Sequence, residues 1–154
     1  MDGIARVAVA IGSNLGNREG HIRAAIDALR PIVGRLRESS LYATAPVGVG
    51  DQPEFLNAAV SGDTMLSPSA LMGKLLEIER AYGRERPFPG APRTLDLDLI
   101  LYGDLIIDSP ALTVPHPRFR DRRFVLEPLA EIAADWRDPV TGRTVEELLR
   151  LTAS

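Results

Sequence analysis

The sequence contains no cysteine and only two histidines among its 154 residues. Without thiols, the chain forms no disulfides, has no cysteine nucleophile and cannot build a cysteine-ligated zinc or iron–sulfur site. Two histidines leave little for a histidine-rich metal centre. If the protein uses a metal, carboxylates are therefore expected to hold it.

The chain also lacks an excess of positive charge and a long apolar run. Its formal net charge of −3 argues against a general binder of nucleic acid or of anionic membranes. No stretch approaches the ~20 apolar residues of a membrane span, and the apolar run before Gly12 is too short for a signal peptide. We expect a cytoplasmic, monomeric protein with no nucleic-acid or membrane partner.

Lysine is nearly absent, because Lys74 is the only lysine among 18 basic residues. Seven of the arginines lie between Arg84 and Arg123. The planar guanidinium binds phosphate or carboxylate through two hydrogen bonds, so the excess can reflect a phosphate-binding function. Biased codon usage would produce the same excess.

The remaining composition, 45% hydrophobic and 25% charged, is that of an ordinary globular protein, and the length predicts a single domain over 1–154. Hydrophobic periodicity predicts strands and helices in this order: strand 4–11, helix 18–33, strands 35–45 and 55–62, helix 68–82 and strand 94–102. This order indicates a ferredoxin-like α+β sandwich, an antiparallel sheet with helices packed on one face. A short strand near 105–107 and helices over 126–133 and 145–151 form a C-terminal extension.

Capping residues and one apolar stripe support the two helices. Asn17 and Ser67 are expected to cap them, since their side chains can accept from exposed backbone N–H groups. The residues Gly12-Ser13-Asn14-Leu15-Gly16 lack the ending of a phosphate-binding loop and are interpreted as a structural turn. Leu71, Leu75, Ile78 and Tyr82 are predicted to form the core stripe of the second helix.

Two aspartates share one face of the strand predicted over 94–102. Side chains alternate along a strand, so Asp96 and Asp98 lie on one face and Leu97 on the other. Carboxylates two residues apart suit Mg²⁺, which completes its shell with water and substrate phosphates. An acidic, half-exposed strand face without a metal is the alternative.

Basic residues flank the proline-rich loop that precedes these aspartates. Arg84 and Arg86 begin the loop and Arg93 ends it, so they can converge on a phosphate held by the metal, as in phosphoryl transfer. Solvated loop charge balanced by Glu85 is the alternative. His116, between two prolines, can donate to a phosphate or move a proton, or be an ordinary surface histidine.

An aromatic residue and a carboxamide are predicted on one face of the third strand. Phe55 and Asn57 could stack a flat heterocycle and pair with its edge, and Phe124 could supply a second aromatic face. The alternative is that both phenylalanines belong to the core.

Four segments together resemble the 6-hydroxymethyl-7,8-dihydropterin pyrophosphokinases of folate biosynthesis. They occur in the order and spacing of that family and cover essentially the whole chain: AIGSNLG over 10–16, QPEFLNAAV over 52–60, PRTLDLD over 92–98 and LTVPHP over 112–117. The resemblance implies a ferredoxin-like fold. It also implies transfer of the pyrophosphoryl group of ATP to the hydroxymethyl oxygen of the dihydropterin, with release of AMP.

The resemblance also implies roles for individual residues. Asp96 and Asp98 would hold two Mg²⁺ ions, and Arg84 and Arg93 would act with them in catalysis. The residues implied in ATP binding are Arg84, Arg86, Arg93, Thr113, His116 and Arg122. Those implied in pterin binding are Thr44, Pro46, Val47, Phe55, Asn57 and Phe124.

One segment departs from the family pattern. Many relatives carry a basic residue and a tryptophan in the loop that matches 87–92, and this chain has neither there. No role is therefore assigned to residues 87–91.

Two other classes of function compete with the enzyme. A noncatalytic, ferredoxin-like metabolite-binding regulatory module would use the same fold, since fold alone does not fix function. An RNA-binding sheet would need stacked aromatics in a basic surround, whereas the strand over 94–102 presents aspartates. The cluster of Asp96, Asp98 and Arg93 favours the enzyme.

Overall fold

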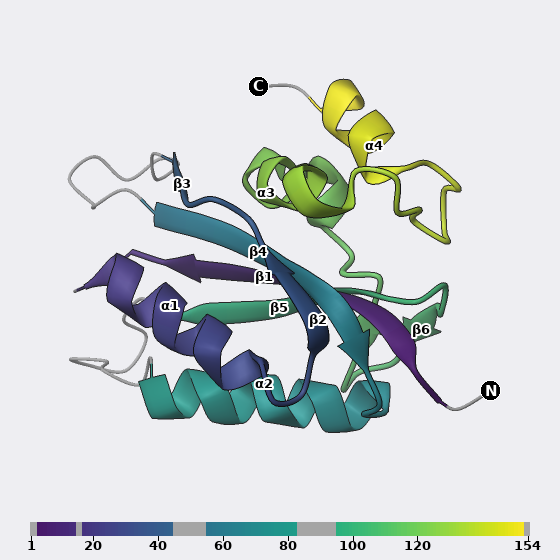
Figure 1. Cartoon of the computed structure of the whole chain (residues 1–154). Helices are drawn as coiled ribbons and strands as arrows, with labels where there is room; N and C mark the ends of the chain where they lie inside the picture. Colours follow the sequence, from purple (N-terminus) through teal and green to yellow (C-terminus); the bar gives the residue numbers. More distant parts are fainter. Residues whose placement is uncertain (1–2, 15–16, 45–54, 83–94, 153–154) are drawn as a thin grey trace.

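An antiparallel sheet crosses the middle of the computed structural model, which describes residues 3–14, 17–44, 55–82 and 95–152 (Figure 1). Its strands lie in the order β2 (Gly34–Glu38), β4 (Phe55–Thr64), β1 (Ala5–Ser13) and β5 (Asp96–Tyr102), and β3 (Tyr42–Thr44) pairs with the start of β4. Both neighbours of β1 run antiparallel to it. The predicted ferredoxin-like arrangement is confirmed.

Helices α1 (Arg18–Leu29) and α2 (Pro68–Tyr82) cover one face of this sheet (Figure 1). Val7, Val9 and Ile11 of β1 are nearly inaccessible to solvent and belong to the same core as the buried side chains of both helices. The alternation of β1 is thus explained, because every second side chain enters this core. Asn17 Oδ1 accepts from the Gly20 amide and Ser67 Oγ from the Ala70 amide, which confirms both predicted caps.

The C-terminal extension covers part of the opposite face. It contains β6 (Ile107–Asp108), β7 (Thr113–Val114), a short 3₁₀ turn η1 (Phe119–Asp121), α3 (Arg123–Ala133) and α4 (Val145–Leu151). Ala8 and Ile100 of the sheet pack here with Phe119, Leu126 and Leu129 in a second core. The sheet therefore packs against helices on both faces, against α1 and α2 on one and against the extension on part of the other.

A predicted helix and a predicted strand have different bounds in the structure. The helix predicted to reach residue 33 ends at Leu29, because Pro31 has no amide hydrogen with which to continue the helical hydrogen bonds. The strand predicted over 35–45 is divided into β2 and β3. Between them, Ser39 Oγ accepts a hydrogen bond from the Ala59 amide and donates one to the Ser40 carbonyl.

One predicted core residue is exposed, and one predicted strand begins later than expected. Tyr82 is 44% exposed and does not belong to the core stripe of α2, whereas Leu71, Leu75 and Ile78 are buried as predicted. The short strand predicted near residues 105–107 begins at Ile107, and Ile106 is exposed.

Within the described residues, no helix is long and apolar enough to cross a membrane.

A buried ion pair joins η1 to the turn before α4. Arg120 donates two hydrogen bonds to the completely buried Asp138 carboxylate, which also accepts from the Thr141 hydroxyl and the Val140 amide. Burial alone raises the pKa of Asp138, but hydrogen bonds from Arg120, Thr141 and Val140 outweigh it and hold the pKa below its usual value. Arg120 is therefore part of the packing that fixes the extension, and its charge is not available to a ligand.

We predict that Asp138→Ala lowers the free energy of unfolding at pH 7 by about 3 kcal/mol, measured by urea denaturation. Removing one partner of a buried pair leaves the other charge uncompensated, and the partial exposure of Arg120 puts the loss at the lower end of the usual range. Glu19→Ala is the control, because the Glu19–Arg23 pair is exposed and contributes about 0.5 kcal/mol or less. Equal losses in the two variants would contradict the assignment.

The Arg120–Asp138 pair also makes the free energy of unfolding depend on pH. A carboxyl group whose pKa is depressed by folding stabilises the protein above its unfolded pKa of about 3.9, and this contribution is lost as pH falls through the folded value. The difference in unfolding free energy between the wild type and Asp138→Ala should therefore be constant near neutrality and shrink below about pH 4. A difference that grew on acidification would contradict this sign.

Candidate active site

The end of β1 and the starts of β4 and β5 meet at one end of the sheet. In the register, Gly12 of β1 pairs with Asn57 of β4 on one side and with Asp96 of β5 on the other. Directly opposed residues of antiparallel strands project from the same face. Asn57, Gly12 and Asp96 thus form one row across three strands, here called the central row.

The two aspartates stand on β5 as the sequence predicts. Leu97 and Leu99 are 3% exposed and face the core of α1 and α2, whereas Asp96 is exposed and Asp98 is half-buried on the other face. In the next row of the sheet, Asp98 pairs with Ala10. Two carboxylates on one open face fit Mg²⁺, which binds through one or two protein carboxylates and fills its remaining positions with water and phosphate. Among the described residues, no group of three or more potential metal ligands occurs.

His116 lies next to this pair, with its Nε2 atom 3.9 Å from Asp98 Oδ1. Its amide donates to the Ile100 carbonyl, which ties the segment after β7 to β5. Its Nδ1 atom accepts from the Arg118 amide at 3.2 Å, so the ring hydrogen belongs on Nε2, the atom that faces Asp98. His116 therefore presents an N–H donor toward the side where the aspartates stand.

The pKa of His116 agrees with this neutral form. Burial lowers the pKa below its usual value, the positive charges of Arg122 and Arg118 lower it further, and the negative charge of Asp96 acts against them. At neutral pH the imidazole is uncharged, and its contact with Asp98 is not an ion pair.

Phe55 and Phe124 are 37% and 40% exposed, so neither ring belongs to the core. Phe55 begins β4 and Phe124 lies in the first turn of α3, the helix that packs over β4. The guanidinium carbon of Arg122 stands 5.6 Å from the centre of the Phe124 ring. The structure thus removes the core alternative for both phenylalanines, while their stacking role stays a prediction.

Asn57 is buried and its side-chain amide is oriented by a neighbour. Asn57 Nδ2 donates to Thr44 Oγ1 at 2.8 Å, which leaves the Oδ1 atom as the acceptor on the other side. Thr44 is held by β3, and β3 is fixed from α3, because Glu131 accepts from the Ser40 amide and from the Tyr42 hydroxyl. The Ser40 hydrogen bond is also the main reason that the pKa of Glu131 lies below its usual value. Sequence reasoning misses Glu131, since no local pattern links it to residues some 90 positions earlier.

Two further predicted site residues, Thr113 and Arg122, lie in the C-terminal extension. Thr113 lies on β7, half-buried, with its hydroxyl 3.4 Å from the Ser109 carbonyl. Arg122 is half-buried at the residue that precedes α3. The remaining predicted site residues lie outside the described residues: Pro46, Val47, Arg84, Arg86 and Arg93.

Glu79 is a residue near the site that the sequence analysis does not identify. It is 9% exposed on α2, and its Oε2 atom accepts from the Leu97 amide at 2.6 Å. Leu97 separates the two aspartates on β5, an edge strand of the sheet. A helix carboxylate thus fixes the backbone from which both aspartates project. The signal in the sequence is a charged residue four positions after Leu75, inside the apolar stripe.

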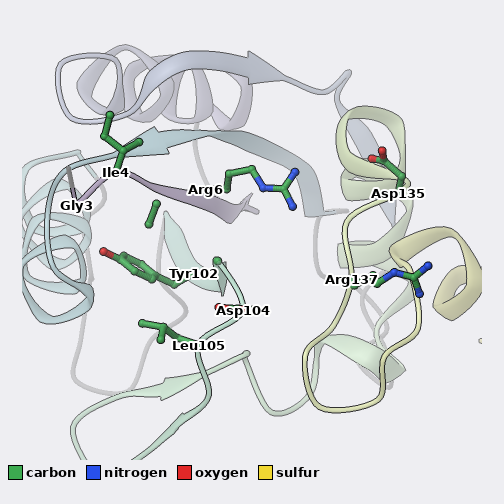
Figure 2. A pocket seen from close by; sticks show the side chains of 10 residues that line it. Gly3, Ile4, Arg6, Tyr102, Asp104, Leu105, Asp135 and Arg137 are labelled. Atoms are coloured by element: carbon green, nitrogen blue, oxygen red, sulfur yellow. The ribbon is translucent and has the colours of Figure 1, made fainter. Parts of the chain in front are cut away.

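A cavity of about 710 Å³ lies at the other end of the sheet (Figure 2). It is lined by the start of β1, the end of β5 and residues before α4, with the side chains of Arg6, Tyr102, Asp104 and Arg137 among them. Arg6 is engaged there, with its guanidinium carbon 4.4 Å from the centre of the Trp136 ring. None of the residues that line this cavity belongs to the central row or to the predicted site.

Comparisons with known proteins agree on one family. A model described as 7,8-dihydro-6-hydroxymethylpterin-pyrophosphokinase (HPPK) matches residues 8–134. The chain is 45% identical over 148 residues to a Pseudomonas aeruginosa 2-amino-4-hydroxy-6-hydroxymethyldihydropteridine pyrophosphokinase, which covers 95% of this chain and 91% of that protein. A Bacillus subtilis protein of the same name is 41% identical over 141 residues, covering 90% of this chain and 84% of that protein.

A solved structure is similar in fold. A crystal structure of Plasmodium falciparum HPPK-DHPS superposes with a TM-score of 0.79 at 14% identity, covering 98% of this chain. The chain spans 46% of the length of that protein, and at this identity the likeness concerns the fold alone.

We predict that Glu79→Ala speeds hydrogen exchange of the Leu97 amide and lowers the free energy of unfolding by about 1–3 kcal/mol, because a buried N–H loses its acceptor. Glu79→Gln keeps a neutral acceptor and should lose less. Glu77→Ala is the control on an exposed position of the same helix, with a change of about 0.5 kcal/mol or less. Unchanged Leu97 exchange in Glu79→Ala would exclude this role.

Proposed function

The chain belongs to the 7,8-dihydro-6-hydroxymethylpterin-pyrophosphokinase family, and we propose that it transfers the pyrophosphoryl group of ATP to the hydroxymethyl oxygen of 6-hydroxymethyl-7,8-dihydropterin, releasing AMP. This is a reaction of folate biosynthesis. The observation that carries the proposal is the pair Asp96 and Asp98 on one open strand face, beside the Nε2 atom of His116.

The bonds exchanged in this reaction need no protein nucleophile. The hydroxymethyl group loses its proton to water as its oxygen forms a bond to the β-phosphorus of ATP. The bond from that phosphorus to the α,β-bridging oxygen breaks, and AMP leaves with the electron pair. Such a transfer depends on positioning and on stabilisation of charge. The absence of cysteine is therefore no obstacle to the reaction.

Asp96 and Asp98 are the residues proposed to hold two Mg²⁺ ions. When bound there, Mg²⁺ would neutralise phosphate charge and lower the pKa of the attacking hydroxyl. The carboxylates themselves face the same side of the sheet as Asn57, so they would hold the triphosphate beside the pterin.

Donors for the phosphates are proposed from the extension and from the loop before β5. His116 supplies its Nε2 hydrogen and Arg122 its guanidinium, and Thr113 would lie near the adenosine. By resemblance to the family, Arg84, Arg86 and Arg93 would bind the phosphates, with Arg84 and Arg93 steadying the transferred group.

The pterin is proposed to stack between Phe55 and Phe124. Its hydrogen-bonding edge would donate to Asn57 Oδ1, whose orientation is fixed by Thr44. By resemblance, the main chain at Pro46 and Val47 would complete the contacts with that edge. This arrangement places the recognised edge over β4 and the reacting arm toward β5.

The noncatalytic metabolite-binding module is the less favoured alternative. It accounts for a heterocycle site at Phe55 and Asn57 but gives no role to the paired aspartates. We further propose that the protein acts in the cytoplasm as a monomer and has no nucleic-acid partner, in keeping with its net charge of −3.

Incubation with ATP, Mg²⁺ and the dihydropterin should produce AMP rather than ADP. Asp96→Ala and Asp98→Ala should each lower turnover by about 100-fold or more, a barrier increase of about 2.7 kcal/mol. Both should retain the fold, since neither side chain is buried. Asp104→Ala, at the far end of the sheet, is the matched control and should keep wild-type activity. No AMP above background from folded wild type would refute the function, and full activity in either site variant would refute the metal assignment.

Loss of one aromatic ring should weaken pterin binding selectively. We expect Phe55→Ala and Phe124→Ala each to raise the KM for the pterin about 3- to 10-fold, because a stacked aromatic pair contributes about 0.5–1.5 kcal/mol beyond its buried area. The KM for ATP should change less than the KM for the pterin in both. Ile106→Ala, which removes an exposed apolar side chain elsewhere, is the control for steady-state kinetics. An unchanged pterin KM in both variants would contradict the stacking.

A further inference from the structure

Gly12 occupies the middle of the central row, between the residue proposed to recognise the pterin and a residue proposed to hold the metal. Asn57 and Asp96 are its direct partners on the two neighbouring strands. Two strand spacings of about 4.8 Å separate the flanking residues, so they stand about 10 Å apart at the backbone. A substrate that contacts both must pass over Gly12.

The backbone does not require glycine at this position. Within the described residues, the glycines with positive φ are Gly3, Gly103 and Gly142, so Gly12 has a conformation open to other residues. It lies in a regular stretch of β1, paired on both sides. The absence of a side chain must therefore be explained by what lies above the strand.

A side chain at position 12 would enter the space beside Asn57. A Cβ atom there would lie 3.2 Å from Asn57 Oδ1 and 3.9 Å from the Leu56 carbonyl oxygen. Asn57 cannot turn away without cost, because its Nδ2 atom donates to Thr44. The added atom would crowd the Oδ1 atom of Asn57, the acceptor proposed to bind the pterin, on the face that carries Asp96.

Gly62 of β4 provides a contrast. A Cβ atom at Gly62 would lie 2.5 Å from the Gly34 carbonyl oxygen and from Val33 Cγ1, so the packing of the protein itself excludes a side chain there. At Gly12 the nearest atom among the described residues belongs to a proposed ligand-binding side chain, at 3.2 Å, and the Leu56 carbonyl oxygen lies at 3.9 Å, an ordinary contact distance. Packing within the protein therefore explains the glycine at position 62, whereas at position 12 the closest contact is with a side chain of the proposed site.

We propose that Gly12 is a specificity-determining residue of the pterin site. Its missing side chain opens the passage across β1 through which the hydroxymethyl arm reaches Asp96 while the opposite edge of the ring stays on Asn57. This role rests on the proposed function. Ala10 lies in the next row, between Ala59 and Asp98, and its small side chain also leaves room above β1.

The test compares Gly12→Ala with the wild type. Pterin binding is measured by fluorescence titration, and both substrates are examined by steady-state kinetics. We expect the Kd and KM for the pterin to rise at least about 10-fold, since small displacements of a bound reactant are costly, while the KM for ATP stays within about 2-fold. The urea midpoint of unfolding should change little. Gly73→Ala in α2 is the matched control, because a Cβ atom there meets nothing within 4 Å, and it should leave both substrates unaffected.

A double variant separates direct obstruction from a displaced Asn57. If the alanine at position 12 blocks the arm, its effect on the pterin Kd persists in an Asn57→Ala background. If the effect vanishes there, Gly12 serves only to orient Asn57 and the proposed passage is overturned. An unchanged pterin Kd in Gly12→Ala overturns it as well.

A measurement on the wild type tests the proposal without relying on variants that must fold. In the complex with the pterin, the Gly12 α-protons should show nuclear Overhauser contacts to the methylene of the hydroxymethyl arm. Absence of these contacts in a saturated complex overturns the proposal for Gly12 while leaving the enzymatic function intact. A wild type that neither binds the pterin nor forms AMP refutes both.

Discussion

The antiparallel register of β1 with β4 and β5 is the constraint on which the site depends. It puts Asn57, Gly12 and Asp96 into one row. Because side chains alternate along a strand, a slip of β5 by one residue would turn Asp96 and Asp98 into the core of α1 and α2. The register resists such a slip because both faces of β1 are buried, Val9 and Ile11 on one side and Ala8 on the other.

The C-terminal extension completes the site as well as the fold. Helix α3 packs over β4 on the sheet face that carries the central row and anchors β3 through Glu131. The same segment supplies His116 and Phe124, and the Arg120–Asp138 pair fixes it to the turn before α4. A simple two-helix sandwich would leave this face of the sheet to water, so the extension supplies both the second core and one side of the site.

Several elements are predictable because their signals are local. The caps of α1 and α2, the alternation of Asp96, Leu97 and Asp98 in β5 and the bounds of α4 follow from neighbouring residues and agree with the structure. The predicted strand over 35–45 fails for the opposite reason, since the break at Ser39 depends on a hydrogen bond with Ala59. Glu79 likewise reads as one polar residue in a helix until packing places it against the Leu97 amide.

The sequence alone determined the chemistry available to this protein: no thiol, a pair of aspartates at strand spacing, and motifs that identify the family. These follow from residue type and short-range spacing, which the chain carries in one dimension. Only the tertiary structure decided that Gly12 separates Asn57 from Asp96 in one row and that Glu79 and Glu131 hold the strands on either side. Those contacts join residues far apart in the chain, and their geometry is set by strand register and helix packing, which no local pattern specifies.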